Sequence, residues 1–404
     1  MSADVVSLLG QIREVGRDPR GPGYQRPGFS PIERELREWF EAEAAARGLD
    51  VEVDANGITW AWATQPGPNA VVTGSHLDSV PGGGQFDGPL GVASALDALD
   101  RLRADGRLER AARPLALAVF PEEEGSRFGV ACLGSRLISG AIAPERALGL
   151  ADAEGDTFAE VAAAYGLDPH RMGPDPERLA GIGSFIELHV EQGVGLIETG
   201  QPVALGASII GHGRWRLRFT GQGNHAGTTP MAHRADPVAA GSAVIGEIPR
   251  LAAGFDRAVA TVGRTSIHPG GTNVIASAMD CWLDIRHADD AVVAQVLQAI
   301  VDRARDIAGA AGVGFGASRE SYSPTTVFDA ELTDRMAAQL PQAPRLPTGA
   351  GHDAGILAAH VPSAMLFVRN PTGVSHAPEE ACEDADARAG AAALADVLAA
   401  ELGA

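Results

Sequence analysis

The sequence is poor in cysteine and aromatic residues and has no long apolar run. The 404 residues include three cysteines, Cys132, Cys281 and Cys382, which lie far apart. This number and spacing exclude a disulfide framework and a cysteine-based zinc knuckle. Any metal must therefore be held by histidines and carboxylates. No apolar run reaches the length of about 18 residues that a membrane-spanning helix needs, so we expect no membrane contact.

Positive charge is also scarce. Asp and Glu number 52 against 32 Lys and Arg, which gives a formal net charge of −20. The basic residues are scattered among acidic ones, so the sequence argues against nucleic acid as a partner, although one arginine could still bind a small anion. The first 20 residues lack the charged, apolar and small-residue regions of a secretory signal. We therefore expect a cytoplasmic protein.

Short β-rich runs alternate with longer helical runs, which predicts an α/β fold. The length fits two or three domains. Leu115–Phe120 is a continuous apolar run, typical of a strand that is covered on both faces. The other elements expected in this part are helices at residues 30–48 and 89–102, strands at 49–62, 69–73, 182–190 and 364–368, and a last helix from residue 384.

From about residue 211 the order becomes strand, helix, strand, strand, helix, strand. This is the ferredoxin-like split pattern, complete in about 110 residues. We therefore expect a discontinuous catalytic domain, residues 1–210 and 322–404, with a smaller α+β domain at residues 211–321 inserted into it.

The motif GSHLDSVPGGGQFDG places His76 after an apolar strand and Asp87 just before a helix. In open α/β sheets, ligands collect beyond the carboxyl ends of strands. The run Gly82-Gly83-Gly84 allows the tight turn that would let both side chains reach one point. A structural strand-end histidine and a helix-capping aspartate explain the motif equally well.

The motif FPEEEG places three consecutive carboxylates directly after the Leu115–Phe120 strand. Their repulsion is unfavourable unless a positive group offsets it, and a metal ion is such a group. Adjacent side chains at a strand end point in different directions, so one carboxylate can bind a metal while its neighbour contacts a water molecule. The alternative is a solvated acidic loop.

Two further motifs contain histidine. IELHVEQG places Glu187, His189 and Glu191 on one face of a strand, and VSHAPEE places His376 in a turn near the C-terminus. Either histidine alone is more often structural. Together, however, the four motifs supply enough ligands for two divalent ions bridged by one carboxylate, an arrangement that serves hydrolysis. The five expected ligands are His76, Asp87, Glu124, His189 and His376.

These motifs, together with NHAGTTPM, TNVI with DIR, and GAGHDA, resemble the hydantoinase/carbamoylase branch of the M20 dinuclear metallopeptidase superfamily in order and spacing. The likeness extends over residues 30–390. It implies two divalent metal ions per subunit (Zn²⁺, Mn²⁺, Co²⁺ or Ni²⁺), bridged by Asp87, with His76 and His376 as ligands of separate metals and Glu124 and His189 as the remaining ligands.

The resemblance also implies the catalytic groups. Glu123 is similar to the general base, because the family places base and ligand immediately before the glycine of the Glu-Glu-Gly motif. From the three consecutive carboxylates alone, Glu122 and Glu123 remain an alternative pair of base and ligand. His225 is similar to a lid histidine that enters the partner subunit's site and stabilises an oxyanion.

The inserted domain is implied to be a lid that also forms a homodimer interface. The substrate-binding residues implied by the resemblance are Gln192, Asn273, Arg286 and His352. Asn273 and Arg286 would bind the substrate carboxylate, since a planar guanidinium suits a bidentate contact. By itself, Arg286 would be interpreted as an ordinary surface arginine. His212 either lines the substrate pocket or is a structural histidine at a strand end.

The resulting hypothesis is an amidohydrolase that cleaves a ureido C–N bond of a small carboxylate, with release of ammonia and carbon dioxide. Allantoate and N-carbamoyl-L-amino acids are the candidate substrates, and Asn224 with Thr228-Thr229 favours allantoate slightly. The alternatives are a dipeptidase or aminoacylase of the same superfamily, and a non-catalytic binding protein on the same fold.

Overall fold

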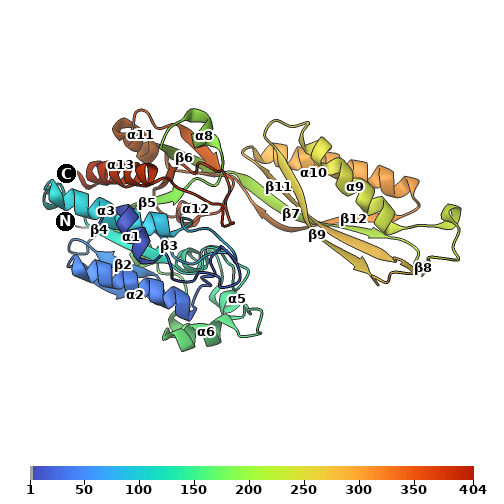
Figure 1. The fold of residues 1–404 in the computed structure, drawn as a ribbon, viewed down its shortest axis with the longest axis horizontal. Helices are drawn as coiled ribbons and strands as arrows, with labels where there is room; N and C mark the ends of the chain where they lie inside the picture. Colours follow the sequence, from blue (N-terminus) through green and yellow to red (C-terminus); the bar gives the residue numbers. More distant parts are fainter. Residues whose placement is uncertain (1–2) are drawn as a thin grey trace. The chain divides into compact units, whose positions relative to one another are not determined.

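The computed structural model describes residues 3–404 and divides into two compact units (Figure 1). Unit 1 extends through Ser208 and resumes at Val327–Ala404, and unit 2 is Ile209–Thr326. Unit 2 is thus inserted into the chain of unit 1. No helix among residues 3–404 combines the length and apolar character needed to cross a membrane.

Unit 1 is built on a nine-stranded sheet with the order β1-β2-β4-β3-β5-β15-β6-β13, and β14 pairs with β6. The four strands β4, β3, β5 and β15 run parallel, whereas β2 and β6 pair antiparallel with the two outer members of this group. Parallel strands end at one edge of a sheet, so the motifs that follow them come together there. The strands are β1 (Asp50–Val53), β2 (Thr59–Trp62), β3 (Ala70–His76), β4 (Leu115–Phe120), β5 (Ile182–Val190), β6 (Val203–Ile209), β13 (Thr326–Val327), β14 (Arg345–Thr348) and β15 (Ser363–Val368).

Helices pack against this sheet. α3 contacts β3, β5 and the last helix α13, while α2 contacts β1 and β2. α2 begins at Pro31, where the Ser30 hydroxyl accepts a hydrogen bond from the backbone N–H of Glu33, and the proline suits the first helical position. The α-helices of unit 1 are α1 (Val5–Gln11), α2 (Pro31–Ala46), α3 (Pro89–Ala104), α4 (Leu133–Ser139), α5 (Pro144–Leu148), α6 (Phe158–Tyr165), α7 (Pro176–Gly181), α8 (Gly195–Thr199), α11 (Ala330–Gln339), α12 (Asp353–Leu357) and α13 (Asp384–Leu402).

The sequence predictions for unit 1 succeed where the chain is apolar throughout. β4 and β5 have the predicted bounds, and every residue of β4 is buried. The single strand predicted at residues 49–62 is wrong, because β1 and β2 form an antiparallel hairpin. Asp54 makes the turn by accepting hydrogen bonds from the backbone N–H groups of Asn56 and Ile58.

Unit 2 is an antiparallel sheet with the order β12-β7-β11-β9 and two helices, α9 and α10, that pack against each other (Figure 1). The chain order β7-α9-β9-β11-α10-β12 with this strand order is the ferredoxin-like arrangement that the sequence predicts. The elements are β7 (Gly211–Thr220), β8 (Asn224–His225), α9 (Pro237–Ala252), β9 (Val259–His268), β10 (Val274–Ile275), β11 (Ala278–His287), α10 (Asp290–Ala310) and β12 (Gly314–Ser323).

The two faces of the unit 2 sheet differ in polarity. Along β7, Trp215, Leu217 and Phe219 are buried in the core formed with the helices, and arginines alternate with them. On the polar face the Arg218 guanidinium lies 3.4 Å from the Asp280 carboxylate.

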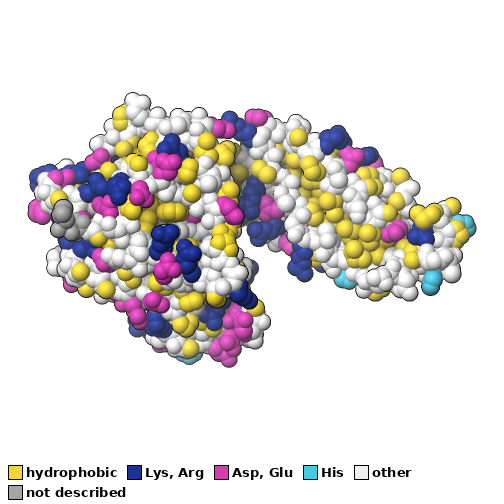
Figure 2. Space-filling model, in the orientation of Figure 1, with side chains coloured by type: hydrophobic (Ala, Val, Ile, Leu, Met, Phe, Trp, Pro, Cys, Tyr) yellow, Lys and Arg dark blue, Asp and Glu magenta, His cyan; other side chains and the backbone are white. Residues whose placement is uncertain are grey.

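On the surface of unit 1 visible in Figure 2, basic and acidic side chains are interspersed.

Candidate metal centre

Two buried histidines of unit 1 each direct one ring nitrogen toward the same place in the structure. His76 ends β3 and His189 lies near the end of β5, and their rings stack with centroids 5.7 Å apart. Nδ1 of His76 lies 3.0 Å from the backbone oxygen of Asp78, and Nδ1 of His189 lies 2.9 Å from that of Val190. Donation from Nδ1–H to these carbonyls leaves each Nε2 with its lone pair free, as a metal ligand requires.

Asp87 lies between two groups of potential ligands. Its Oδ1 is 3.4 Å from Nε2 of His76 and 3.2 Å from Nε2 of His189, while its Oδ2 is 3.5 Å from Nε2 of His376. The Glu124 carboxylate lies 3.4 Å from the same His376 nitrogen. His76, Asp87 and His189 therefore form one group able to hold a metal, and Asp87, Glu124 and His376 form a second.

The residues of this centre fit divalent metal ions. Nε2 of His76 and Nε2 of His189 are buried and have no hydrogen-bond partner among the described residues. Buried polar atoms are nearly always satisfied, so an unpartnered pair that faces one carboxylate indicates a missing positive partner. Imidazole and carboxylate together suit Zn²⁺ and related first-row ions.

The loop after β4 presents its three glutamates in different directions. Asp78 accepts hydrogen bonds from the backbone N–H groups of Glu123 (3.2 Å) and Glu124 (3.1 Å), which fixes the loop beside His76. Glu123 is buried, and its Oε2 lies 3.8 Å from Nε2 of His76. Glu122 has a positive φ of 52°, and its Oε1 accepts from the backbone N–H of Arg127 at 2.8 Å. Glu123 and Glu124 thus face the centre, and Glu122 caps its own loop.

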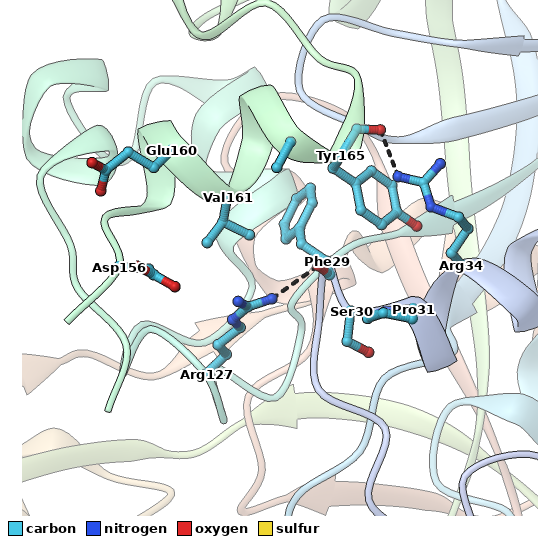
Figure 3. A pocket seen from close by; sticks show the side chains of 10 residues that line it. Phe29, Ser30, Pro31, Arg34, Arg127, Asp156, Glu160, Val161 and Tyr165 are labelled. Carbon is cyan, nitrogen blue, oxygen red and sulfur yellow. Dashed lines mark hydrogen bonds between the residues drawn. The ribbon is translucent and has the colours of Figure 1, made fainter. Parts of the chain in front are cut away.

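An open pocket of about 520 Å³ lies on another part of unit 1, and Figure 3 shows its lining. Arg127 reaches it from the loop after β4, and its guanidinium is held by Asp152 and by the backbone oxygens of Gly28 and Phe29. On the other side, the Arg34 guanidinium stacks on the Tyr165 ring at 3.9 Å. None of the predicted site residues lines this pocket, so it is separate from the metal centre.

Burial and neighbouring charges shift the pKa values of the carboxylates and histidines at this centre. Burial raises the pKa of Glu123 and of Glu124 well above the usual range. Burial alone would lower the pKa of His76, but the carboxylates of Glu123, Asp78 and Asp87 raise it well above its usual range. Burial would raise the pKa of Asp87, but His189 and His76 hold it well below its usual range.

The backbone is strained where the site is built. Cys132 and His376 have positive φ values of 56° and 58°, although neither is glycine. Gly88, at φ 85°, begins α3 directly beside His76, and a Cβ at this position would lie 2.5 Å from the His76 ring. Only glycine therefore allows the helix to start this close to the ligand.

Two predicted substrate-binding residues of unit 1 also lie at the centre. The Gln192 amide nitrogen donates to Oδ2 of Asp87 at 2.8 Å and lies 3.3 Å from Nε2 of His376. The ring of His352 is buried 4.5 Å from that of His189, and both of its nitrogens lack a hydrogen-bond partner in the described chain. Burial, reinforced by the charge of His189, lowers the pKa of His352 well below its usual range.

The predicted residues of unit 2 fall into two groups. His212 and Arg286 are cross-strand partners on β7 and β11, and Arg286 contacts Asp284 at 2.8 Å. His225 lies on β8 beyond the other end of β7, paired with Val274 next to Asn273. A strand rises about 3.3 Å per residue, so the part of β7 from His212 to its end at Thr220 spans about 26 Å, and His225 lies beyond that end. One unit 2 therefore cannot place both groups on the same small substrate.

Sequence reasoning missed two carboxylates that support the centre. Asp78 fixes the Glu123–Glu124 backbone, and Glu380 accepts from the backbone N–H groups of Phe86 and Asp87. Asp78 follows His76 by two residues in a His-x-Asp pattern, which was a usable signal. Burial raises the pKa of Glu380 to about 7.

Comparison with known proteins gives one consistent family. Residues 72–400 match the model of peptidase family M20/M25/M40. An N-carbamoyl-L-amino acid amidohydrolase from Geobacillus stearothermophilus is 37% identical, covering 96% of this chain and 95% of that protein. An allantoate amidohydrolase from Escherichia coli (strain K12) is 32% identical, covering 98% of this chain and 96% of that protein. The crystal structure of a hydantoinase/carbamoylase family amidase from Burkholderia multivorans superposes with a TM-score of 0.86 at 30% identity, covering 99% and 98% of the two chains. The chain belongs to peptidase family M20/M25/M40.

Proposed function

We propose that this protein is a metal-dependent amidohydrolase that cleaves the ureido C–N bond of a small carboxylate, either an N-carbamoyl-L-amino acid or allantoate. The observation that carries the proposal is the position of Asp87, whose two oxygens face two separate groups of histidine and carboxylate ligands. A carboxylate shared by two metals is the arrangement of two-metal hydrolases. The two relatives match this chain over almost the whole of both lengths. Their names, N-carbamoyl-L-amino acid amidohydrolase and allantoate amidohydrolase, indicate that the bond is a ureido C–N bond.

His76 and His189 would hold one ion, Glu124 and His376 the other, and Asp87 both. Bound there, Zn²⁺, Mn²⁺, Co²⁺ or Ni²⁺ would supply Lewis-acid chemistry and lower the pKa of water. Hydrolysis needs a group that takes a proton from the attacking water and gives it to the leaving nitrogen. Glu123 fits this role because its carboxylate is buried at the edge of the centre and is not a member of either ligand group.

Unit 2 would act as a lid and as a dimerisation domain. Arg286, with His212 beside it, and Asn273 would bind the substrate carboxylate, and His225 would stabilise the negative charge that develops on the carbonyl oxygen. The separation of at least about 26 Å between these groups along β7 supports a site that draws them from two subunits. Gln192 and His352 would contact the substrate from unit 1.

The test is kinetic. The purified protein is reloaded with each of the four metals and is offered N-carbamoyl-L-amino acids, allantoate and dipeptides while ammonia and free amino acid are measured. Release of ammonia from a ureido substrate supports the proposal. Turnover of dipeptides alone would assign the chain to the peptidases of the family, and metal binding without any turnover would make it a binding protein.

A further inference from the structure

Glu380 connects two loops that carry metal ligands. It follows His376 by four residues and is buried, with 6% of its surface exposed. Its Oε1 accepts hydrogen bonds from the backbone N–H groups of Phe86 (2.8 Å) and Asp87 (3.0 Å). One oxygen on the His376 loop thus holds the peptide unit from which the shared carboxylate of Asp87 projects.

The loop before Asp87 is shaped to admit this carboxylate. A Cβ added to Gly84 would lie 2.4 Å from Oε1 of Glu380 and 2.5 Å from its Cβ, closer than non-bonded atoms approach. The third glycine of the Gly82-Gly83-Gly84 run therefore leaves the space that Glu380 fills. The neighbouring Glu379 is exposed.

The Asp87 backbone has no comparable support from the helix that follows. α3 starts with Gly88 as its N-cap, which has no side chain to accept a hydrogen bond. Without Glu380, the buried N–H of Asp87 would lose its acceptor, and the peptide before Asp87 could rotate. A rotation there turns the carboxylate that faces His189 with one oxygen and His376 with the other.

We propose that Glu380 is a positioning residue of the metal centre, which fixes the Asp87 carboxylate and ties it to the His376 loop so that the affinities for both ions depend on it. The inference rests on the proposed two-metal function. Groups that orient metal ligands typically contribute about 10- to 100-fold to metal affinity or activity.

The experiment compares Glu380→Ala, Glu380→Gln and the control Glu379→Ala with the wild type. Bound metal per chain is measured at a series of free metal concentrations, and the visible absorption of the Co²⁺-loaded protein reports ligand geometry. Glu380→Ala is expected to weaken the binding of both ions and to lower kcat by about 10- to 100-fold, with an altered Co²⁺ spectrum. Glu380→Gln keeps an oxygen that can accept both N–H groups, so it is expected to stay close to the wild type, as is Glu379→Ala.

Gly84→Ala provides a second route, because its methyl group displaces Glu380 without removing it, and the same losses are expected. Wild-type metal affinity and Co²⁺ spectrum in folded Glu380→Ala or Gly84→Ala would overturn the proposal. A lower melting temperature of the metal-free variant with unchanged metal affinity would also overturn it, since that is the result of a purely structural role.

Failure of the proposed function gives a different pattern. If the wild type binds two ions but hydrolyses no ureido compound, the proposed function is wrong. The metal affinities of the wild type and the Glu380 variants still test the role of Glu380 in that case. If the wild type and Glu380→Ala hydrolyse ureido substrates equally well, only the positioning role of Glu380 is wrong. A wild type that binds no divalent ion overturns both.

Discussion

Oδ1 of Asp87 lies 3.2 Å from Nε2 of His189, and both side chains are buried. Burial would lower the pKa of His189, but the neighbouring Asp87 carboxylate raises it above its usual range. At this contact, the proposed metal ion would compete with a proton for Nε2 of His189.

The first prediction concerns the shared ligand. Asp87→Asn removes the charge that both groups of ligands use, so we expect affinity for both ions to fall by more than about 100-fold, beyond the range typical of outer-shell groups. The sequence contains no lysine, so a carbamylated lysine cannot replace the bridge. Metal analysis after dialysis checks the result, and retention of one tightly bound ion would show that Asp87 belongs to a single site.

The second prediction separates the three glutamates after β4. Glu123→Gln should keep its metal and lose about 10²- to 10⁴-fold in kcat, the usual contribution of a general base. Glu124→Gln should lose metal at the site that it shares with His376. Metal content and kcat are measured together on both variants. Metal loss in Glu123→Gln with retention in Glu124→Gln would reverse the two roles.

The third prediction is a pH dependence of metal binding. The pKa of His76 and that of His189 are raised in the metal-free chain, so both imidazoles stay protonated above the usual histidine pKa of about 6.5. Stability gained from these charged imidazoles is fully present below that value and is lost as pH rises through the raised pKa. Metal needs the neutral rings, so affinity should increase with pH over the same window, with release of protons. Calorimetry in buffers of different ionisation enthalpy measures the protons released; metal affinity that is constant from pH 6 to 9 contradicts the prediction.

The fourth prediction addresses sharing of the site between subunits. Glu123→Gln and His225→Ala should each be inactive alone, and both should retain metal if His225 acts from unit 2. Mixing the two after subunit exchange should restore part of the activity, because one site of the mixed dimer receives both native residues. Exchange is followed by mass spectrometry of tagged chains. Confirmed exchange without recovered activity means that each chain supplies its own histidine.

The fifth prediction concerns stability away from the metal. The buried Arg37 guanidinium contacts the buried Glu33 carboxylate and donates to the backbone oxygen of Gly57 at 2.9 Å. Arg37→Leu removes the positive partner of this buried carboxylate and leaves it with the hydrogen bonds from the Phe29 N–H and the Tyr165 hydroxyl. The free energy of unfolding should therefore fall by about 3–5 kcal/mol, and adding Glu33→Gln should recover part of the loss. In the exposed pair Arg305 and Asp302, Arg305→Leu should change stability by less than about 1 kcal/mol. Urea unfolding measures all of these variants, and equal losses at the two arginines would refute the argument.

Sequence patterns predicted the candidate centre because several of the proposed ligands lie at or just beyond the ends of apolar strands that are easy to recognise. β4 and β5 are buried along almost their full length, so their ends, and the polar residues beyond them, follow from the apolar runs themselves. β6 was missed, because its mixed burial gives neither a continuous apolar run nor a regular alternation. The direction of each glutamate side chain could not be predicted from the sequence, because the three residues are identical and differ only in their backbone angles. Glu122 points away from the centre because its φ is positive, and no sequence pattern indicates that angle.

The position of β15 has a consequence for how the protein is made. This strand lies between β5 and β6 in the sheet, yet it is separated from both in the chain by the whole of unit 2. During synthesis, unit 2 can complete its own core while the sheet of unit 1 still lacks an interior strand, and His376 leaves the ribosome later still. The full set of proposed ligands is therefore present only after nearly the entire chain has been translated. A product truncated before β15 would have an exposed strand edge and would lack His376.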